Sequence, residues 1–270
     1  MPETARMSSG LSRRLGLGDA VVLGLGSMIG AGVFSAFAPA ARAAGSGLLL
    51  ALAVAAVVAY CNATSSARLA ARHPESGGTY VYGRERLGPF WGYLAGWSFV
   101  VGKTASCAAM ALTFASYAWP GHLRLAAVLG VVALTALGVG GVQRSAAATR
   151  VIVAVVLAVL ALVVAGCFAG GRAGDPGLGL GTSPHGVLQA AGLLFFAFAG
   201  YARIATLGEE VRDPARTIPR AITVALAVTV AVYAAVAAGV LSVLGPDGTG
   251  AAPAPLRAAV ETGRLDGLGP

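Results

Sequence analysis

Long apolar stretches separated by short polar segments form the main pattern of this 270-residue chain. Seven of the apolar stretches are close to the roughly 20 residues that an α-helix needs to cross a bilayer. They cover residues 17–43, 46–70, 90–118, 124–142, 148–170, 187–210 and 218–244. Residues 71–90 are too polar to cross and are rich in Pro, Gly and Arg, which predicts a loop. The pattern as a whole predicts an all-α membrane protein with seven transmembrane helices.

Glycines interrupt the first apolar stretch, where residues 24–34 read GLGSMIGAGVF. Gly24, Gly26, Gly30 and Gly32 stand where a spanning helix favours Leu or Ala, so we expect a break between Gly26 and Gly32. Backbone groups freed inside a bilayer persist only where a ligand, water or packed protein takes over their hydrogen bonds. The glycines therefore predict a binding site. The alternative is close helix packing through Gly26 and Gly30, as in small-xxx-small motifs.

The sixth apolar stretch is also irregular, because Gly200 and the charged Arg203 lie well inside it. A single glycine in a spanning helix is as often a packing position as a break. Transporters built from inverted repeats, however, carry a discontinuous helix at corresponding places in each half, with the substrate held between the two near the midplane. We therefore expect the sixth helix to break between Phe198 and Arg203, facing the break in the first.

Composition excludes several classes of protein. With 57% hydrophobic residues, 11% charged residues and a mean hydropathy of +0.78, the chain is not a soluble domain. The net charge of +8 forms no basic stripe with interleaved aromatics, so no nucleic-acid partner is expected. The three cysteines lie in apolar runs and the three histidines are far apart, so we expect no metal site and no cofactor. The spans hold neither paired carboxylates nor a nucleophile with its base, which argues against an enzyme with catalytic residues.

The distribution of arginine predicts the orientation of the chain. A cytoplasmic N-terminus places twelve arginines inside: Arg6, Arg13, Arg14, Arg68, Arg72, Arg84, Arg86, Arg144, Arg150, Arg212, Arg216 and Arg220. It leaves five outside: Arg42, Arg124, Arg172, Arg257 and Arg264. No short apolar region with a clean cleavage site follows Arg14, so the first stretch is expected to remain in the mature protein. We expect a multi-pass protein of the plasma (cell inner) membrane with its N-terminus in the cytoplasm.

Three segments resemble the amino acid, polyamine and organocation permease superfamily: GLGSMIGAGVF, PESGGTYVYGRERLGPFWGYLAGW and FFAFAGYARIATLGEEVRDPARTIPRAI. The resemblance implies a five-plus-five inverted-repeat fold with helices 1 and 6 discontinuous, and secondary active transport of amino acids by alternating access. On that fold the chain divides into a cytoplasmic tail (1–16), a first five-helix repeat (17–170), an extracellular loop (171–186), the start of a second repeat (187–244) and an extracellular segment (245–270).

The same resemblance implies where an amino acid substrate binds. Its carboxylate would meet free N–H groups of the first helix, which agrees with the affinity of a helix N-terminus for anions. Its ammonium would meet carbonyls of both broken helices, with Phe196 at the position of an aromatic gate; alternatively, Phe196 is an ordinary packed or lipid-facing side chain. The implied substrate-binding residues are Met28, Gly30, Ala31, Gly32, Phe196, Ala199 and Gly200.

The chain departs from the superfamily pattern at three points. Ala202 stands where many relatives have an acidic residue, which argues against a dedicated carrier of cationic amino acids. Val156 stands where ion-coupled relatives often have a lysine. The chain also stops at Pro270, after a segment (APAPLRAAVETG) that resembles the extracellular helix before an eighth span, so spans from the eighth onward are expected to be missing.

Lys103 is the residue that we expect to replace the absent lysine in proton coupling. It lies near the middle of the third apolar stretch, too far from either end for its side chain to reach the headgroups. A charge at that depth is costly, so we expect it to face the protein interior, either exchanging protons or bonding the carbonyls of a broken helix. Arg203 is the second coupling candidate, since it would lower the pKa of a nearby lysine.

Two other functions remain open from the sequence. A chain with seven spans is compatible with a receptor or sensor, although such receptors usually place the N-terminus outside. A nonfunctional fragment of a longer permease, or half of an assembly completed by a second chain, is the other alternative.

Overall fold

The computed structural model describes residues 15–73, 77–139, 142–169 and 182–263. Within these ranges the long helices are α1 (Leu17–Ser35), α3 (Leu48–Arg72), α5 (Pro89–Ala118), α6 (Leu123–Val139), α7 (Val142–Ala169), α8 (Pro184–Phe198) and α10 (Pro214–Ala251). The described residues contain seven helical stretches that are long and apolar enough to cross a membrane. The predicted all-α membrane class and the number of seven spans are therefore confirmed. The first span is shorter than predicted, because α1 ends at Ser35 and residues 37–43 belong to the second stretch, Phe37–Arg72.

Shorter helical elements connect the long ones. They are α2 (Phe37–Ala44), α4 (Thr79–Leu87), α9 (Ala202–Ala205) and α11 (Pro255–Thr262), with 3₁₀ turns η1 (Gly45–Gly47), η2 (Pro120–His122) and η3 (Ala199–Tyr201). The helix α11 falls on the APAPLRAAVETG segment, where a helix was expected. The helix α10 runs past residue 244, but Gly245 has a φ of 68° and leaves the helical conformation. A short second segment then begins at Pro246.

The helix α4 shows that the loop prediction for residues 71–90 is wrong. It is bounded by Gly78 and Gly88, whose φ angles of 53° and 103° favour glycine. These glycines mark the ends of a helix and not the absence of one. Tyr82 of α4 is buried, with its ring centroid 5.9 Å from that of His73, the residue that follows α3. The contact holds α4 against the end of α3.

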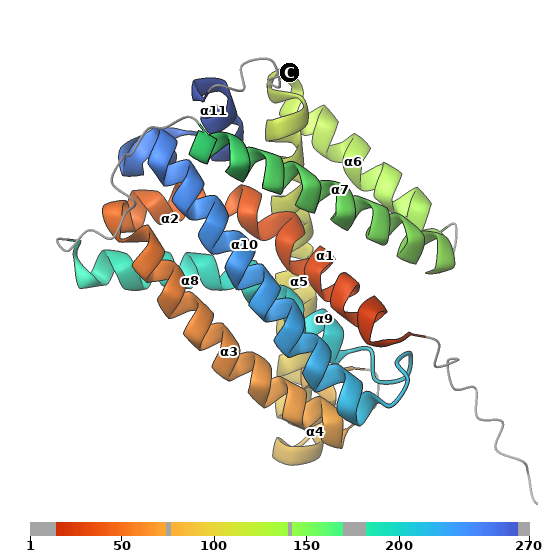
Figure 1. Ribbon diagram of the computed structural model, residues 1–270. Helices are drawn as coiled ribbons and strands as arrows, with labels where there is room; N and C mark the ends of the chain where they lie inside the picture. Colours follow the sequence, from red (N-terminus) through yellow and green to blue (C-terminus); the bar gives the residue numbers. More distant parts are fainter. Residues whose placement is uncertain (1–14, 74–76, 140–141, 170–181, 264–270) are drawn as a thin grey trace, which may run out of the picture.

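The helix α10 lies in the middle of the packed part of the chain, between α3 and α1 in Figure 1. It contacts α1, α2, α3 and α7, while α8 packs against α1, α2 and α3. The buried face of α3 is a stripe of alanines four residues apart: Ala51, Ala55, Ala59, Ala63 and Ala67. Small side chains let membrane helices approach closely, so this stripe explains how α3 fits against its neighbours.

The helix α5 packs mainly against α4 and α6, and α6 packs mainly against α5. Only 6% and 11% of their most apolar parts are buried, against 50% for α10. Large apolar side chains are exposed along both helices, among them Phe90, Trp91, Trp97, Leu112, Leu129 and Leu134. Such a surface suits contact with lipid or with further protein.

Polar contacts tie the start of α1 to two other elements. The Leu15 N–H donates to the Glu210 carbonyl at 3.0 Å, and the Arg212 N–H donates to the Leu15 carbonyl at 3.0 Å. Asp19 accepts the Gly16 N–H at 3.1 Å and forms an ion pair of 2.7 Å with Arg150 of α7. The first turn of α1 is thereby joined to α7 and to the segment that precedes α10.

The approach of α8 to α2 predicts opposite effects at two glycines of α8. A Cβ at Gly186 would collide with the Ala43 carbonyl oxygen, whereas a Cβ at Gly192 would meet no atom within 4 Å. We expect Gly186→Ala to lower the free energy of unfolding by about 1–3 kcal/mol, because backbone must move. Gly192→Ala is expected to leave it unchanged or raise it by up to about 1 kcal/mol. Thermal unfolding in detergent measures both variants, and equal stability of the two would contradict this packing.

Candidate functional site

The glycines of α1 do not unwind it. The helix is continuous from Leu17 to Ser35, so the break predicted between Gly26 and Gly32 is wrong. The interruption comes at Ala36, whose N–H donates to the Gly32 carbonyl at 3.1 Å before α2 begins. The N–H groups expected to bind a carboxylate lie inside α1, where such groups bond the carbonyl four residues earlier. A carboxylate would bind there only after α1 opens at these residues.

The glycines serve as contact points between helices. A Cβ at Gly24 would collide with Ile204 of α9, and a Cβ at Gly26 would come within 3.0 Å of Val153 of α7. At Gly32 a Cβ would collide with the Tyr233 hydroxyl and lie 2.5 Å from the Ala197 Cβ. Close packing, the alternative considered for this segment, therefore describes α1. It fits Gly26 but not Gly30, which is exposed with open space where a Cβ would stand.

The end of α8 is irregular inside the predicted interval. The α-helix ends at Phe198, a 3₁₀ turn covers Ala199–Tyr201, and the short α9 follows. The last four carbonyls of an α-helix lack their usual donors four residues on. The Tyr233 hydroxyl donates to the Ala197 carbonyl at 3.1 Å, and the Ser27 hydroxyl donates to the Gly200 carbonyl at 2.7 Å. Side chains from α10 and α1 thus satisfy the carbonyls where α8 changes its helical form.

The structure brings some of the expected site residues together and separates others. Met28, Gly32 and Gly200 are buried where α1 meets the end of α8, and a Cβ at Gly200 would collide with the Ser27 carbonyl. We call this region the α1–α8 contact: Ser27, Met28, Gly32, Ala197, Gly200 and Tyr233.

The other expected site residues lie around the α1–α8 contact. Phe196 is 40% exposed and Ala199 is half-buried, while Gly30 lies open on the surface of α1. Ala31 continues α1, but its side chain lies outside the described set. Three of the seven expected residues, Met28, Gly32 and Gly200, therefore belong to the contact.

Tyr233 is a residue of this contact that the sequence analysis missed. It is fully buried, and its hydroxyl lies 2.6 Å from the Met28 carbonyl oxygen. Thr229, one turn earlier on α10, is also fully buried and bonds the Ala225 carbonyl at 2.8 Å. The sequence did contain a signal for these residues, namely two hydroxyl side chains four residues apart in an apolar helix. A hydroxyl inside a bilayer needs a hydrogen-bond partner, so the pair indicates a contact with another helix.

The two charged coupling candidates lie on the surface of the described chain. Lys103 is exposed in the described chain, with its Nζ 5.7 Å from the centre of the Phe99 ring, because α5 is loosely packed. Its role in proton coupling stays a prediction. Arg203 is exposed as well, and its guanidinium donates to the Thr206 hydroxyl at 3.3 Å. Across the described ranges, no cluster of three His, Cys, Asp or Glu side chains could hold a metal ion.

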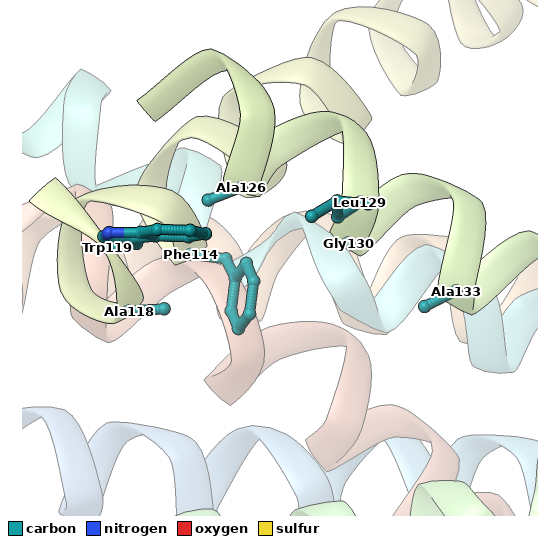
Figure 2. Close-up of a pocket in the computed structure, with 7 residues that line it drawn as sticks. All are labelled: Phe114, Ala118, Trp119, Ala126, Leu129, Gly130 and Ala133. Atoms are coloured by element: carbon teal, nitrogen blue, oxygen red, sulfur yellow. The ribbon is translucent and has the colours of Figure 1, made fainter. Parts of the chain in front are cut away.

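An apolar pocket lies away from the α1–α8 contact, between the ends of α5 and α6 (Figure 2). Its volume is about 360 Å³, and it is lined by Phe114, Ala118, Trp119, Ala126, Leu129, Gly130 and Ala133. None of these seven residues is charged. The pocket therefore suits hydrocarbon and offers no partner to the charged ends of an amino acid.

The geometry of α1 predicts a contrast between Gly30 and Gly32. Gly32→Ala should lower the free energy of unfolding by about 1–3 kcal/mol, since the new methyl group collides with the Tyr233 hydroxyl and Ala197. Gly30→Ala should be neutral or slightly stabilising, because the space beside Gly30 is open. Thermal unfolding of the two variants in detergent tests the contrast. Greater damage from Gly30→Ala would show that α1 is rotated from the position described.

Comparison with known proteins identifies a family and several relatives of this chain. The sequence profile of the family described as "Amino acid permease" matches residues 19–260. A protein of Mycobacterium tuberculosis named as an uncharacterized transporter is 68% identical over 262 residues, which are 96% of this chain and 60% of that protein. The branched-chain amino acid permease BcaP of Bacillus subtilis is 29% identical over 78% of this chain and 51% of its own length.

A third relative is a plant protein, the vacuolar cationic amino acid transporter 2 of Arabidopsis thaliana. It is 30% identical over 78% of this chain and 38% of its own length. The chain thus spans about 60% of the length of the mycobacterial relative and less of the other two. The family profile nevertheless covers most of the described helices, from α1 to α11. This multi-pass membrane chain belongs to the amino acid permease family.

Proposed function

We propose that this chain forms the substrate-binding part of a secondary active amino acid transporter that works by alternating access. The observation that carries the proposal is the α1–α8 contact. There, two spans from different halves of the chain meet through small residues, at the point where α8 leaves the α-helical form. In transporters built from inverted repeats, the substrate site lies between two such discontinuous helices.

The proposed fold is the five-plus-five inverted repeat. The pair α1 and α2, interrupted at Ala36, is the first discontinuous helix, and α8 with η3 and α9 is the second. Residues 17–170 form the first repeat and residues 187–244 begin the second. With the N-terminus in the cytoplasm, the Asp19–Arg150 pair lies at the inner side of the membrane. The arginine distribution supports this orientation.

The proposed substrate site lies beside the α1–α8 contact. Opening of α1 frees the N–H groups of Gly30, Ala31 and Gly32 for the substrate carboxylate, at the positive end of the remaining half-helix. The open space at Gly30 leaves room for that group. Carbonyls of Met28, Phe196 and Ala199 receive the ammonium, and the half-exposed ring of Phe196 covers the site.

The proposed substrates are amino acids with uncharged side chains. The carboxylates of the described chain lie at helix ends, in connections or in short helices: Asp19, Glu85, Glu209, Glu210, Asp213, Asp247 and Glu261. A cationic side chain in the middle of the spans would therefore meet no carboxylate of the described ranges. A charged group at that depth without a partner is costly, which disfavours cationic substrates. The name of the Bacillus relative, a branched-chain amino acid permease, fits this class, whereas the name of the Arabidopsis relative, a cationic amino acid transporter, does not.

Uptake of labelled leucine tests the proposal. Because this chain spans about 60% of the mycobacterial relative, it is substituted for the matching part of that protein, and the chimera is reconstituted in proteoliposomes. We expect the chimera to concentrate leucine when a proton gradient is imposed. The 270-residue chain alone should show none of this uptake, because the rocking of one repeat against the other requires two complete repeats. A correctly inserted chimera that takes up no uncharged amino acid would refute the proposal.

Gly30→Leu is the variant that tests the site. Its side chain would fill the open space proposed for the carboxylate, so we expect leucine uptake to be abolished while the amount of inserted protein is unchanged. The matched control is Gly18→Leu, on the same helix and also without neighbours within 4 Å, which should transport normally. Equal transport by the two variants would contradict the carboxylate position.

Lys103 tests proton coupling in the same chimera. The proposal is that Lys103, with Arg203 as a second candidate, gains and loses a proton during transport, facing protein once further helices cover α5. Lys103→Met should lose the pH dependence of leucine uptake while keeping leucine binding. Lys103→Arg should behave alike, because an arginine keeps its proton. Uptake that follows pH normally in both variants would assign Lys103 a structural role.

A further inference from the structure

The hairpin of α5, η2 and α6 holds the apolar pocket that the proposed transport site does not use. We call it the α5–α6 pocket and define it by the seven residues drawn in Figure 2. Its volume of about 360 Å³ falls within the range of about 300–1,000 Å³ that is usual for small-molecule sites. Phe114 of α5 and Leu129 of α6 are 55% and 53% exposed, so the pocket opens at the surface of the described chain.

Small residues create the pocket. Ala115 of α5 and Ala126 and Ala127 of α6 form a buried cluster at which the two helices touch. A Cβ at Gly130 would lie 3.3 Å from the Phe114 ring, so the glycine lets this ring approach α6. Four of the seven lining residues are Ala or Gly, and because their side chains are short, a recess remains between the helices.

The lining of the pocket suits hydrocarbon. Apart from the ring nitrogen of Trp119, the seven side chains carry no polar atom. The neighbouring hydroxyl groups of Thr113 and Ser116 donate to carbonyls of their own helix, at 2.8 and 2.7 Å. A polar group placed in the recess would therefore lose its hydrogen bonds to water without gaining others.

The rim of the pocket is polar. Trp119, His122 and Arg124 are exposed and lie in or beside η2, which joins two spans, so they stand at one boundary of the membrane. The ring centroids of Trp119 and His122 are 4.8 Å apart, and in Figure 2 the nitrogen of Trp119 is on the side away from Phe114. Tryptophan is typical of this level of a membrane, because its ring is apolar and its N–H donates a hydrogen bond. The rim thus offers donors beside an apolar recess.

Arg124 gives the rim a positive charge. Within the described ranges it forms neither an ion pair nor a hydrogen bond. The sequence from residue 86 to residue 174 contains no Asp or Glu, so the hairpin itself supplies no carboxylate. A guanidinium binds phosphate through two parallel hydrogen bonds, and basic residues near a membrane surface attract anionic lipids. Shape and charge together fit a phospholipid, with an acyl chain in the recess and an anionic headgroup at the rim.

We propose that the α5–α6 pocket binds an anionic phospholipid, with one acyl chain along Phe114 and Gly130 and the phosphate at Arg124. Lipid tails are as apolar as the helices around them, so burial of the chain does not by itself distinguish one lipid from another. The recess holds the chain through close packing, and the headgroup supplies the selectivity. The site is independent of the proposed transport function.

The fluorescence of Trp119 tests the site, because bromine on an acyl chain quenches a tryptophan that it touches. Replacing the exposed Trp91 and Trp97 by Phe leaves Trp119 as the one tryptophan of the 270-residue chain. This chain is reconstituted in phosphatidylcholine bilayers that contain increasing fractions of brominated phosphatidylglycerol. We expect quenching to saturate, and to reach half of its maximum at about one fifth of the fraction needed with brominated phosphatidylcholine, the preference that one cation supplies near a membrane surface. Equal quenching by the two lipids at every fraction would overturn the proposal.

Two variants test the recess and the rim separately. Ala133→Phe fills the recess and should abolish the saturating part of the quenching, whereas Val131→Phe, on the opposite side of α6, should keep it. Arg124→Gln should make the two lipids equal, and Arg86→Gln, near the other end of α5, should keep the preference of about fivefold. Unchanged quenching in Ala133→Phe, or an unchanged preference in Arg124→Gln, would contradict the site.

A further span of a longer protein is the competing occupant of the pocket. The chimera with the mycobacterial relative, with every tryptophan except Trp119 replaced, decides between the two. We expect brominated phosphatidylglycerol to quench Trp119 in the chimera as it does in the 270-residue chain. If neither brominated lipid quenches Trp119 there, a span covers the pocket and the proposal is wrong. No step measures uptake, so a failure of leucine transport would leave this result unaffected.

Discussion

The need to satisfy backbone groups without water governs the centre of this protein. A carbonyl left unpaired inside a bilayer costs several kcal/mol, so each irregular turn at that depth requires a donor from elsewhere in the protein. Where α8 ends at Phe198, the donors are Tyr233 of α10 and Ser27 of α1. Each hydroxyl has one proton and a second acceptor, the Met28 carbonyl for Tyr233 and the Gly24 carbonyl for Ser27, so the end of α8 shares its donors with α1.

Small residues make that approach possible. Gly32 and Gly200 lie where a single methyl group would strike the neighbouring helix, and the buried face of α3 is a stripe of alanines. Without a hydrophobic driving force between helices in lipid, such close contacts supply the dispersion energy that holds spans together. The same residues that pack α1 against α8 thus bring the hydroxyls of Ser27 and Tyr233 within reach of main-chain carbonyls.

Charge is arranged around this apolar centre. The described carboxylates lie at helix ends, in connections or in short helices, and Asp19 both caps α1 and pairs with Arg150 of α7. The hydroxyl groups at the centre of the bundle, those of Ser27, Thr229 and Tyr233, bond main-chain carbonyls.

The sequence by itself determined the membrane class, the number of spans and the family, because hydropathy over about 20 residues and short motifs are local properties. It misplaced the limit between the first two spans, which lies at Ala36 and not near residue 43. It placed a break between Phe198 and Arg203, where the structure has the 3₁₀ turn η3 followed by the short α9. It did not determine whether the glycines of α1 unwind the helix or let neighbours approach, since glycine permits both. Only the tertiary structure decided this, because Tyr233, Ala197 and Val153 come from other helices. For the same reason, Tyr233 could be recognised only once its partners on α1 and α8 were in place.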